Sequence, residues 1–265
     1  MHGRRRLVDG PITVTVGSLP PAIERAAIVL VTVQDAQLPG ALVELTEARL
    51  AAGSVVLHAS GTANPREALQ RVRDQGHPAG TFHPLVPIPD PEHAPALMRG
   101  AWVGVDGDPR AVAAARELAT RVGAHVLAIP PAGRAAYHAA AVMVSNFPTV
   151  LAALAASLMH RAGVDESSAR SAIRHLMRAT VTNLADADPD VALTGPISRG
   201  DVETVARHLD ALAATPDLDA VYRALSRAAL PLAAAQGTDP AALRRIADLL
   251  AVTPSRSLST TDPRP

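Results

Sequence analysis

The sequence has no cysteine, no lysine and few aromatic residues, and each absence excludes a class of function. Without cysteine the chain can form no disulfide, no thiol nucleophile and no cysteine-based zinc site. All 25 basic residues are arginine, which excludes Schiff-base chemistry on a lysine and the lysine of a P-loop. Aromatic residues make up only 2% of the chain, which argues against a surface on which nucleic-acid bases stack.

The charge of the chain is balanced, because 25 acidic residues face the 25 arginines. A net charge of zero with no long basic run argues against nucleic acid as the main partner. The longest uninterrupted apolar runs, such as residues 26–33, are too short to span a bilayer. The N-terminus has no apolar signal segment. The sequence therefore predicts a cytoplasmic protein with no membrane partner.

Short apolar segments alternate with helical patterns in the first half of the chain. The segments are rich in β-branched residues, as in strands that are buried on both faces of a parallel sheet. Strands are predicted at residues 12–16, 27–33, 54–58, 81–85, 102–105 and 124–129, and helices at 39–52, 65–75 and 109–122. This alternation is typical of a doubly wound α/β domain.

After residue 130 the pattern becomes entirely helical. Helices are predicted at residues 131–161, 166–184, 201–213, 217–236 and 239–251. Pro148 is expected to kink the first of them, because proline cannot donate the backbone hydrogen bond. The sequence thus predicts an α/β domain at residues 1–130, an all-α domain at 131–252 and a disordered Ser/Thr/Pro-rich tail at 253–265.

Polar or small residues follow three of the predicted strands. In open parallel sheets, ligands bind outside the carboxyl ends of the strands. At the end of the strand at 27–33 these residues are Val33 and Asp35. At the end of the strand at 54–58 they are His58, Ser60 and Gly61, and in the strand at 81–85 the residue is His83. Asp35 could instead cap a helix, and His58 could instead pack in the core.

Three polar side chains stand out in the middle of the predicted helix at 131–161, which is rich in Ala, Val, Leu and Met. At about 100° per residue, His138 and Ser145 fall almost on one line, and Asn146 lies about 80° from His138. A site at a domain junction is a common place for ligands. These three residues are therefore predicted to close the site from the helical side.

Four motifs occur together in an order that resembles a known family. They are His58-x-Ser60-Gly61, Phe82-His83-Pro84-Leu85, Tyr137-His138-Ala139-Ala140-Ala141 with Ser145-Asn146-Phe147, and Leu193-Thr194-Gly195-Pro196 with Arg199-Gly200-Asp201. Between about residues 26 and 236 the chain resembles Rossmann-like proteins that carry the helical domain of unknown function 2520. That family is similar to the 6-phosphogluconate dehydrogenase, ketopantoate reductase and pyrroline-5-carboxylate reductase group, which pairs a dinucleotide-binding domain with a helical domain that often dimerises.

The resemblance implies an oxidoreductase that uses NADP or NAD, acts on a small metabolite and forms a homodimer. Relatives often use a Lys–Asn pair on the long helix, and this chain has no lysine. His138 is therefore the expected proton donor or acceptor, with Asn146 binding the substrate oxygen and Ser145 orienting it. His83 is expected to line the catalytic site. On the cofactor side the resemblance implies Val33, Asp35, His58, Ser60 and Gly61.

The chain departs from the family pattern at its N-terminus. It contains no Gly-x-Gly-x-x-Gly turn, whose backbone amides would bind the pyrophosphate of the cofactor. The Rossmann-like sheet is therefore predicted to be incomplete at its N-terminal side. A mis-assigned start, a natural loss of cofactor binding and a different binding mode all remain open. Two other functions are alternatives: a non-catalytic dimeric scaffold, and a metal-dependent hydrolase that uses His58, His83, His138 and Asp35.

Overall fold

The computed structural model describes residues 19–88 and 91–251, and the chain divides into two compact units, Met1–Thr149 and Val150–Pro265. The strand predicted at 12–16 and the tail predicted at 253–265 lie outside the described residues. The boundary between the units falls inside the helical segment that the sequence places after residue 130, because the first part of that segment packs on the sheet.

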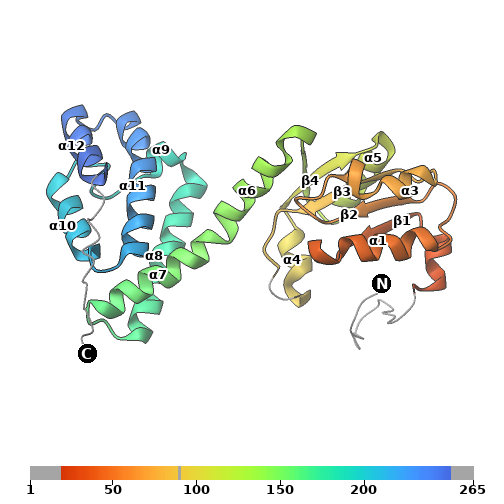
Figure 1. The fold of residues 1–265 in the computed structure, drawn as a ribbon, viewed down its shortest axis with the longest axis horizontal. Helices are drawn as coiled ribbons and strands as arrows, with labels where there is room; N and C mark the ends of the chain where they lie inside the picture. The colour runs from red at the N-terminus through yellow and green to blue at the C-terminus, as the bar shows by residue number, and fades with distance from the viewer. Residues whose placement is uncertain (1–18, 89–90, 252–265) are drawn as a thin grey trace, which may run out of the picture. The chain divides into compact units, whose positions relative to one another are not determined.

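The first unit is built on a five-stranded sheet with the order β1-β2-β3-β4-β5 (Figure 1). The strands are β1 (Ile28–Val31), β2 (Val55–His58), β3 (Ala79–Pro84), β4 (Trp102–Gly107) and β5 (His125–Ala128). The first three strands are parallel, but β4 is antiparallel to β3, and β5 is parallel to β4. The predicted Rossmann-like sheet is therefore confirmed as a mostly parallel one, with the β3–β4 pair as its antiparallel exception.

The reversal at β4 follows from the connection that precedes it. The described residues of this connection, 85–88 and 91–101, form only the short helices η3 (Pro91–His93) and α4 (Ala94–Met98). A parallel crossover usually needs a longer helix that covers one face of the sheet. Because this connection supplies none, the chain turns back and β4 pairs with β3 in the opposite direction.

Helices cover both faces of the sheet. On one face, α5 (Pro109–Arg121) places Ala111, Ala115 and Ala119 against the sheet, and all three are fully buried. On the other face, α1 (Leu38–Glu47) buries three leucines against β2. The remaining helical segments between the strands are η1 (Pro21–Arg25), η2 (Asp35–Gln37), α2 (Pro65–Ala68) and α3 (Gln70–Asp74).

β1 forms one edge of the described sheet and is only partly covered. Ile28 and Leu30 are 37% and 39% exposed, although both belong to an apolar strand. The described strands form the Rossmann-like sheet that the sequence predicts, and β1 is its partly exposed edge.

The predicted kink of the long helix is confirmed. After η4 (Pro131–Gly133), helix α6 (Arg134–Ser145) ends at Asn146, and α7 (Phe147–Arg161) begins one residue later. Pro148 accounts for the break, because it has no N–H to donate to the carbonyl four residues earlier and its ring crowds that carbonyl. By length and composition, Pro131–Arg161 could cross a membrane, and its most apolar stretch is unburied. The sequence argument considered only uninterrupted apolar runs.

The second unit is helical. Its core contains Val205, Leu209, Ala233, Ile246 and Leu250, and it is formed by α10 (Val202–Leu212), α11 (Pro216–Ala235) and α12 (Pro240–Ala251). The other helices of this unit are α7, α8 (Glu166–Asp186) and α9 (Pro189–Ala192). Two arginines of α11 donate to the last carbonyls of α12, since Arg223 Nη1 lies 2.7 Å from Leu249 O and Arg227 Nη1 lies 2.9 Å from Leu250 O. These bonds satisfy carbonyls that a helix end leaves free.

Candidate functional site

Two histidines and a tyrosine meet above the loop that follows β2. His83, near the end of β3, lies with its ring centroid 6.0 Å from that of His138 on α6. The hydroxyl of Tyr137, also on α6, lies 2.7 Å from His83 Nδ1. The first two turns of α6 therefore bring both side chains to the carboxyl edge of the parallel strands, where the sequence places the site.

Two glycines make this approach possible. A Cβ atom at Gly61 would lie 2.8 Å from His83 Nε2 and would also collide with the ring of His138. A Cβ atom at Gly104 of β4 would lie 2.9 Å from Tyr137 Cζ. Both distances are shorter than real Cβ contacts allow, so any side chain at Gly61 would displace the two imidazoles.

Burial and the neighbouring charges favour the neutral form of His83, and Tyr137 can select the tautomer that carries the proton on Nε2. Burial lowers the pKa of His83, and the nearby His138 and Arg134 lower it further. Burial raises the pKa of Tyr137 to about 12, so its hydroxyl keeps its proton at neutral pH. That hydroxyl can donate to His83 Nδ1, which leaves the imidazole proton on Nε2. His83 therefore presents an N–H donor on the side of Gly61.

His58 holds the loop that carries Ser60 and Gly61. Its side chain is completely buried, and the backbone N–H of Ser60 donates to its Nδ1 over 3.2 Å. The opposite nitrogen, Nε2, must then carry the proton, and it lies 3.2 Å from the hydroxyl of Thr81. A residue so placed cannot touch a ligand, and we interpret His58 as a support of the loop.

The burial of His58 should make the stability of the first unit depend on pH. Burial, with a further contribution from Arg134, lowers the pKa of His58 to about 4. Between pH 4 and pH 6.5 the unfolded chain therefore binds a proton that the folded chain does not bind. Stability should fall by about 2 kcal/mol between pH 7 and pH 5 from this residue alone.

Urea unfolding at the two pH values measures this effect. The variant His58→Asn, whose amide oxygen can still accept from Ser60 N–H, should lose most of the difference between pH 7 and pH 5. An equal pH dependence in the variant and the natural chain would contradict the assignment of this dependence to His58.

A buried ion pair lies beneath the histidines. Arg134 Nη2 donates to Asp106 Oδ2 over 2.9 Å and to the hydroxyl of Thr81 over 3.3 Å. The side chains of Arg134 and Asp106 are only 5% and 7% exposed. The Nε and Nη1 atoms of Arg134 are buried without a hydrogen-bond partner. The pair thus ties the start of α6 to β3 and β4 and supports the position of Tyr137 and His138.

Asp35 and Ser60 belong to one hydrogen-bonded loop system. Thr62 Oγ1 donates to Asp35 Oδ2 over 2.6 Å and lies 3.2 Å from Ser60 Oγ. Burial of Asp35 raises its pKa, but hydrogen bonds from Thr62 and Ser60 outweigh this and lower the pKa below its usual value. Asp35 begins η2, and Val33 lies 37% exposed beside it. The loops after β1 and β2 are therefore joined at the sheet edge.

Ser145 and Asn146 lie away from this cluster. They follow His138 by two helical turns, which is about 10 Å along the axis. Ser145 Oγ donates to Ala141 O over 2.7 Å and lies 2.8 Å from Asn146 Oδ1, and both residues are exposed. No hydrogen bond joins either side chain to the sheet within residues 19–88 and 91–251. The structure brings His83, His138 and Gly61 together but not these two residues.

No group of three His, Asp or Glu side chains in the described part of the chain could hold a metal ion. His58 already uses both of its nitrogens, on Ser60 and Thr81. The metal-dependent hydrolase therefore has no structural support among these residues.

Four residues of the cluster were not selected from the sequence. They are Tyr137, Thr81, Asp106 and Arg134. Thr81 and Asp106 could have been selected because each is a polar residue in an apolar strand. A buried polar group needs a hydrogen-bond partner, so such a residue indicates a polar contact inside the domain. The sequence gives no such indication for Tyr137. On the helix Tyr137 points about 100° away from His138, and its partner His83 is 54 residues away in the chain.

Comparison with protein families identifies both parts of this architecture. A Rossmann-like domain matches residues 2–84, and the domain of unknown function DUF2520 matches residues 101–229. The chain joins a Rossmann-like domain to a DUF2520 domain. The resemblance inferred from the four motifs is thus confirmed, and the DUF2520 match begins at β4, well before the helical segment.

Solved structures share this fold. Protein TM1727 from Thermotoga maritima is 23% identical, with 84% of each chain covered and a TM-score of 0.68. The NADP oxidoreductase candidate BF3122 from Bacteroides fragilis is 21% identical over 78% of this chain and 76% of its own, with a TM-score of 0.61. Pyrroline carboxylate reductase from Plasmodium falciparum, solved with NADP bound, is 10% identical over 94% and 86%, with a TM-score of 0.59. No curated protein matches the chain.

The residues present fit only part of a dinucleotide. Gly61 and Ser60 offer a backbone that a flat ring can approach closely. The sequence has no Gly-x-Gly-x-x-Gly turn, and none of the loops described at the sheet edge replaces it. The residues present therefore do not fit the pyrophosphate of NADP in the way that a glycine-rich turn would.

Proposed function

We propose that this Rossmann-like and DUF2520 chain is an NAD(P)-dependent oxidoreductase that acts on a C=O or C=N bond of a small metabolite. The observation that carries the proposal is the cluster of His83, Tyr137 and His138 above Gly61, at the carboxyl edge of the sheet. NADP-related proteins among the structures of similar fold support the class of reaction.

The side chains supply the proton chemistry of such a reaction. Reduction of a carbonyl or imine requires a proton at its oxygen or nitrogen. The neutral His83 donates a hydrogen bond from Nε2 to that atom, with Tyr137 holding its tautomer. His138, on the other side of Gly61, gives or takes the proton. The buried Arg134–Asp106 pair positions α6, so both roles depend on it.

A screen of small ketones, aldehydes and cyclic imines with NADPH and NADH tests this function through the absorbance of the reduced nicotinamide. With any substrate found, His138→Phe should lower kcat by about 10²–10⁴-fold, as expected for the loss of general acid–base catalysis. His208→Phe, at an exposed histidine on α10 outside the proposed interface, is the matched control and should retain full activity. Unchanged activity of the His138 variant would exclude its proton role.

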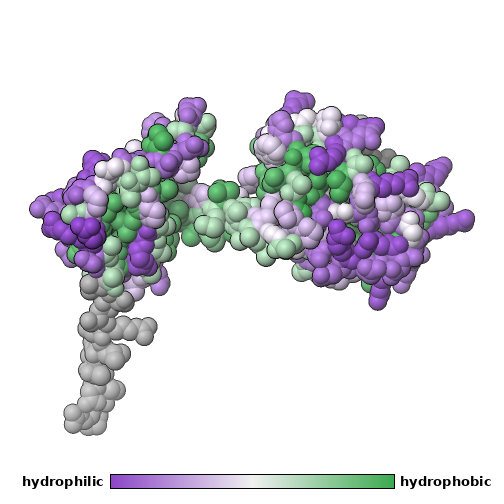
Figure 2. Space-filling model, turned by 90° about the horizontal axis from the view of Figure 1, so that it is seen from above, coloured by the Kyte–Doolittle hydropathy of each residue, from purple (hydrophilic) through white to green (hydrophobic). Residues whose placement is uncertain are grey.

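We also propose that the protein is a soluble homodimer that associates through α7 and α8. No residue of α7 is buried, although the helix is rich in Ala, Leu and Val. Val150 of α7 is 52% exposed, and on α8 Leu176 and Val181 are 62% and 65% exposed. Figure 2 shows hydrophobic surface along the helical segment that contains α7. Exposed apolar area of this kind usually marks an interface.

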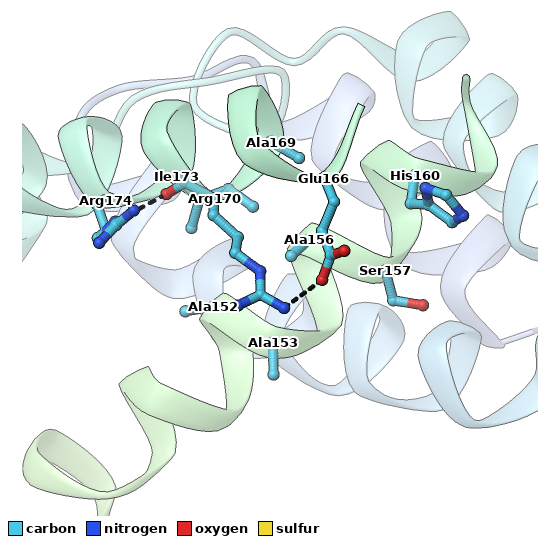
Figure 3. Close-up of a pocket in the computed structure, with 10 residues that line it drawn as sticks. All are labelled: Ala152, Ala153, Ala156, Ser157, His160, Glu166, Ala169, Arg170, Ile173 and Arg174. Atoms are coloured by element: carbon cyan, nitrogen blue, oxygen red, sulfur yellow. Dashed lines mark hydrogen bonds and ion pairs between the residues drawn. The ribbon is translucent and has the colours of Figure 1, made fainter. Parts of the chain in front are cut away.

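The groove between α7 and α8 favours a second copy of the chain over lipid. It has a volume of about 740 Å³. Its α7 wall carries small residues, Ala152, Ala153 and Ala156, which allow a helix to approach closely (Figure 3). Its α8 wall carries an ion pair of Glu166 with Arg170. Charged groups suit the polar rim of a protein interface, whereas acyl chains would leave them unsolvated.

Sedimentation of the full chain tests the dimer. Ala156→Arg should convert dimer to monomer at micromolar concentration, because its long charged side chain fills the groove. Arg121→Ala, on the exposed face of α5, should leave association unchanged. A monomeric natural chain, or one that partitions into lipid vesicles, would contradict the proposal.

A further inference from the structure

The only tryptophan of the chain is exposed beside the candidate site. Trp102 is one of five aromatic residues in 265, and its side chain is 50% exposed. It belongs to neither of the two hydrophobic cores of the sheet. Its indole lies against the imidazole of His125, with ring centroids 5.1 Å apart and planes inclined by 35°. Packing within the first unit therefore does not account for this residue.

The strand register places these rings next to Tyr137. Trp102 pairs with His125, and Gly104 pairs with both His83 and Leu127. Alternate residues of a strand share a face, so Trp102 lies on the face of Gly104, about 7 Å further along β4. Tyr137 covers Gly104. Trp102, His125 and the 40% exposed Leu127 thus form an aromatic patch that continues the site outward from His83 and Tyr137.

The charge around the aromatic patch indicates what it can bind. A tryptophan face binds either a flat ring or a cation such as an ammonium group. Binding of a cation is usually completed by a carboxylate. Residues 97–105 and 120–128, which lead into and begin β4 and β5, contain no acidic residue. Their basic groups are Arg99, His125 and Arg121, and Arg121 is already paired with Glu117. The surroundings therefore favour a neutral or anionic flat ring over an ammonium group.

We propose that the aromatic patch binds a planar ring of the substrate whose reacting carbonyl or imine lies at His83 and His138. The inference rests on the proposed function for the position of the reacting bond, but the binding of the ring needs no turnover. It narrows the substrate class to small metabolites that carry an aromatic ring near the carbonyl or imine group.

Tryptophan fluorescence of the full chain tests this directly, because the emission comes from Trp102 alone. Phenylpyruvate should quench the emission saturably, and pyruvate, which lacks the ring, should bind at least about tenfold more weakly, as expected for one stacked ring. N-acetyltryptophanamide corrects for light absorbed by the probe. His125→Ala should weaken phenylpyruvate binding about fivefold, and the exposed control His208→Ala should not change it.

Several results would overturn the inference. They are equal binding of the two acids, no saturable quenching by phenylpyruvate, and binding that is unchanged in His125→Ala. Emission typical of a buried indole in the chain alone would show that another part of the protein or a second copy covers the aromatic patch. If NADPH binds while the ring-bearing acid does not, the proposed function survives and only this inference fails. If phenylpyruvate binds and NADPH does not, the inference about the ring survives and the proposed function fails.

Discussion

Replacing His83 with leucine is expected to lower kcat by about 10²–10³-fold while leaving the fold intact. The expected size is that for the loss of one hydrogen-bond donor that faces the charge developing on the substrate oxygen. Leucine has a similar volume and fits the half-buried position near the end of β3. The measurement is the steady-state rate with a substrate from the screen, together with circular dichroism of the variant.

Removing the hydroxyl of Tyr137 should have a smaller effect on kcat than replacing His83. Tyr137→Phe keeps the ring above Gly104 but removes the bond to His83 Nδ1, so the tautomer of His83 is no longer fixed. We expect kcat to fall about tenfold, in line with the loss of one hydrogen bond. A change in KM with unchanged kcat, in either variant, would show that these residues bind the substrate without assisting the reaction.

Replacing Arg134 with methionine is expected to destabilise the first unit by about 3–5 kcal/mol. The substitution leaves the carboxylate of Asp106 buried and unpaired, and that is the costly way to break a buried ion pair. The hydroxyl of Thr81 also loses a donor. Urea unfolding measures the loss, with hydrogen exchange of β3 and β4 to localise it to the first unit.

A second variant distinguishes the lost charge pairing from a simple change of shape. In Arg134→Met with Asp106→Asn, the unpaired charge is gone and the side chain can still accept the bond from Gly107 N–H. This double variant should recover about half or more of the stability. Arg121→Ala breaks an exposed pair with Glu117 and should cost less than about 1 kcal/mol. A small loss in Arg134→Met would contradict the structural role assigned to the buried pair.

The positions of the strands and helices follow from the sequence because each relies on local chemistry. The apolar, β-branched run AIVLVTV is typical of a strand even at the sheet edge, and Pro148 removes a backbone donor from the middle of a long helical pattern. The direction of β4 could not be predicted in this way. A strand buried on both faces has the same apolar pattern in either direction. The only sequence feature that agrees with the reversal is the lack of a long helical pattern before β4.

Some residues of the candidate site could be predicted from the sequence and others could not. His58, His83 and Gly61 were selectable because they end strands whose carboxyl edges must coincide. Ser145 and Asn146 were selected from the helical wheel, which gives direction but not distance along the axis. Arg134 and Asp106 are separated by 28 residues, and only the packing of α6 on the sheet brings them together. The exposure of Trp102, on which the proposed substrate class depends, could not be predicted from the sequence pattern.

The most direct test of the central claim is a calorimetric titration of the full chain with NADPH, followed by NADH. If the sheet edge at Gly61 belongs to an NAD(P)-dependent oxidoreductase, NADPH or NADH should bind saturably with a Kd below about 1 mM, which corresponds to about −4 kcal/mol. The affinity should be modest, because the described residues offer no glycine-rich turn for the pyrophosphate. The absence of saturable binding for both nucleotides would contradict the proposed function and leave a non-catalytic dimeric scaffold as the better account of this chain.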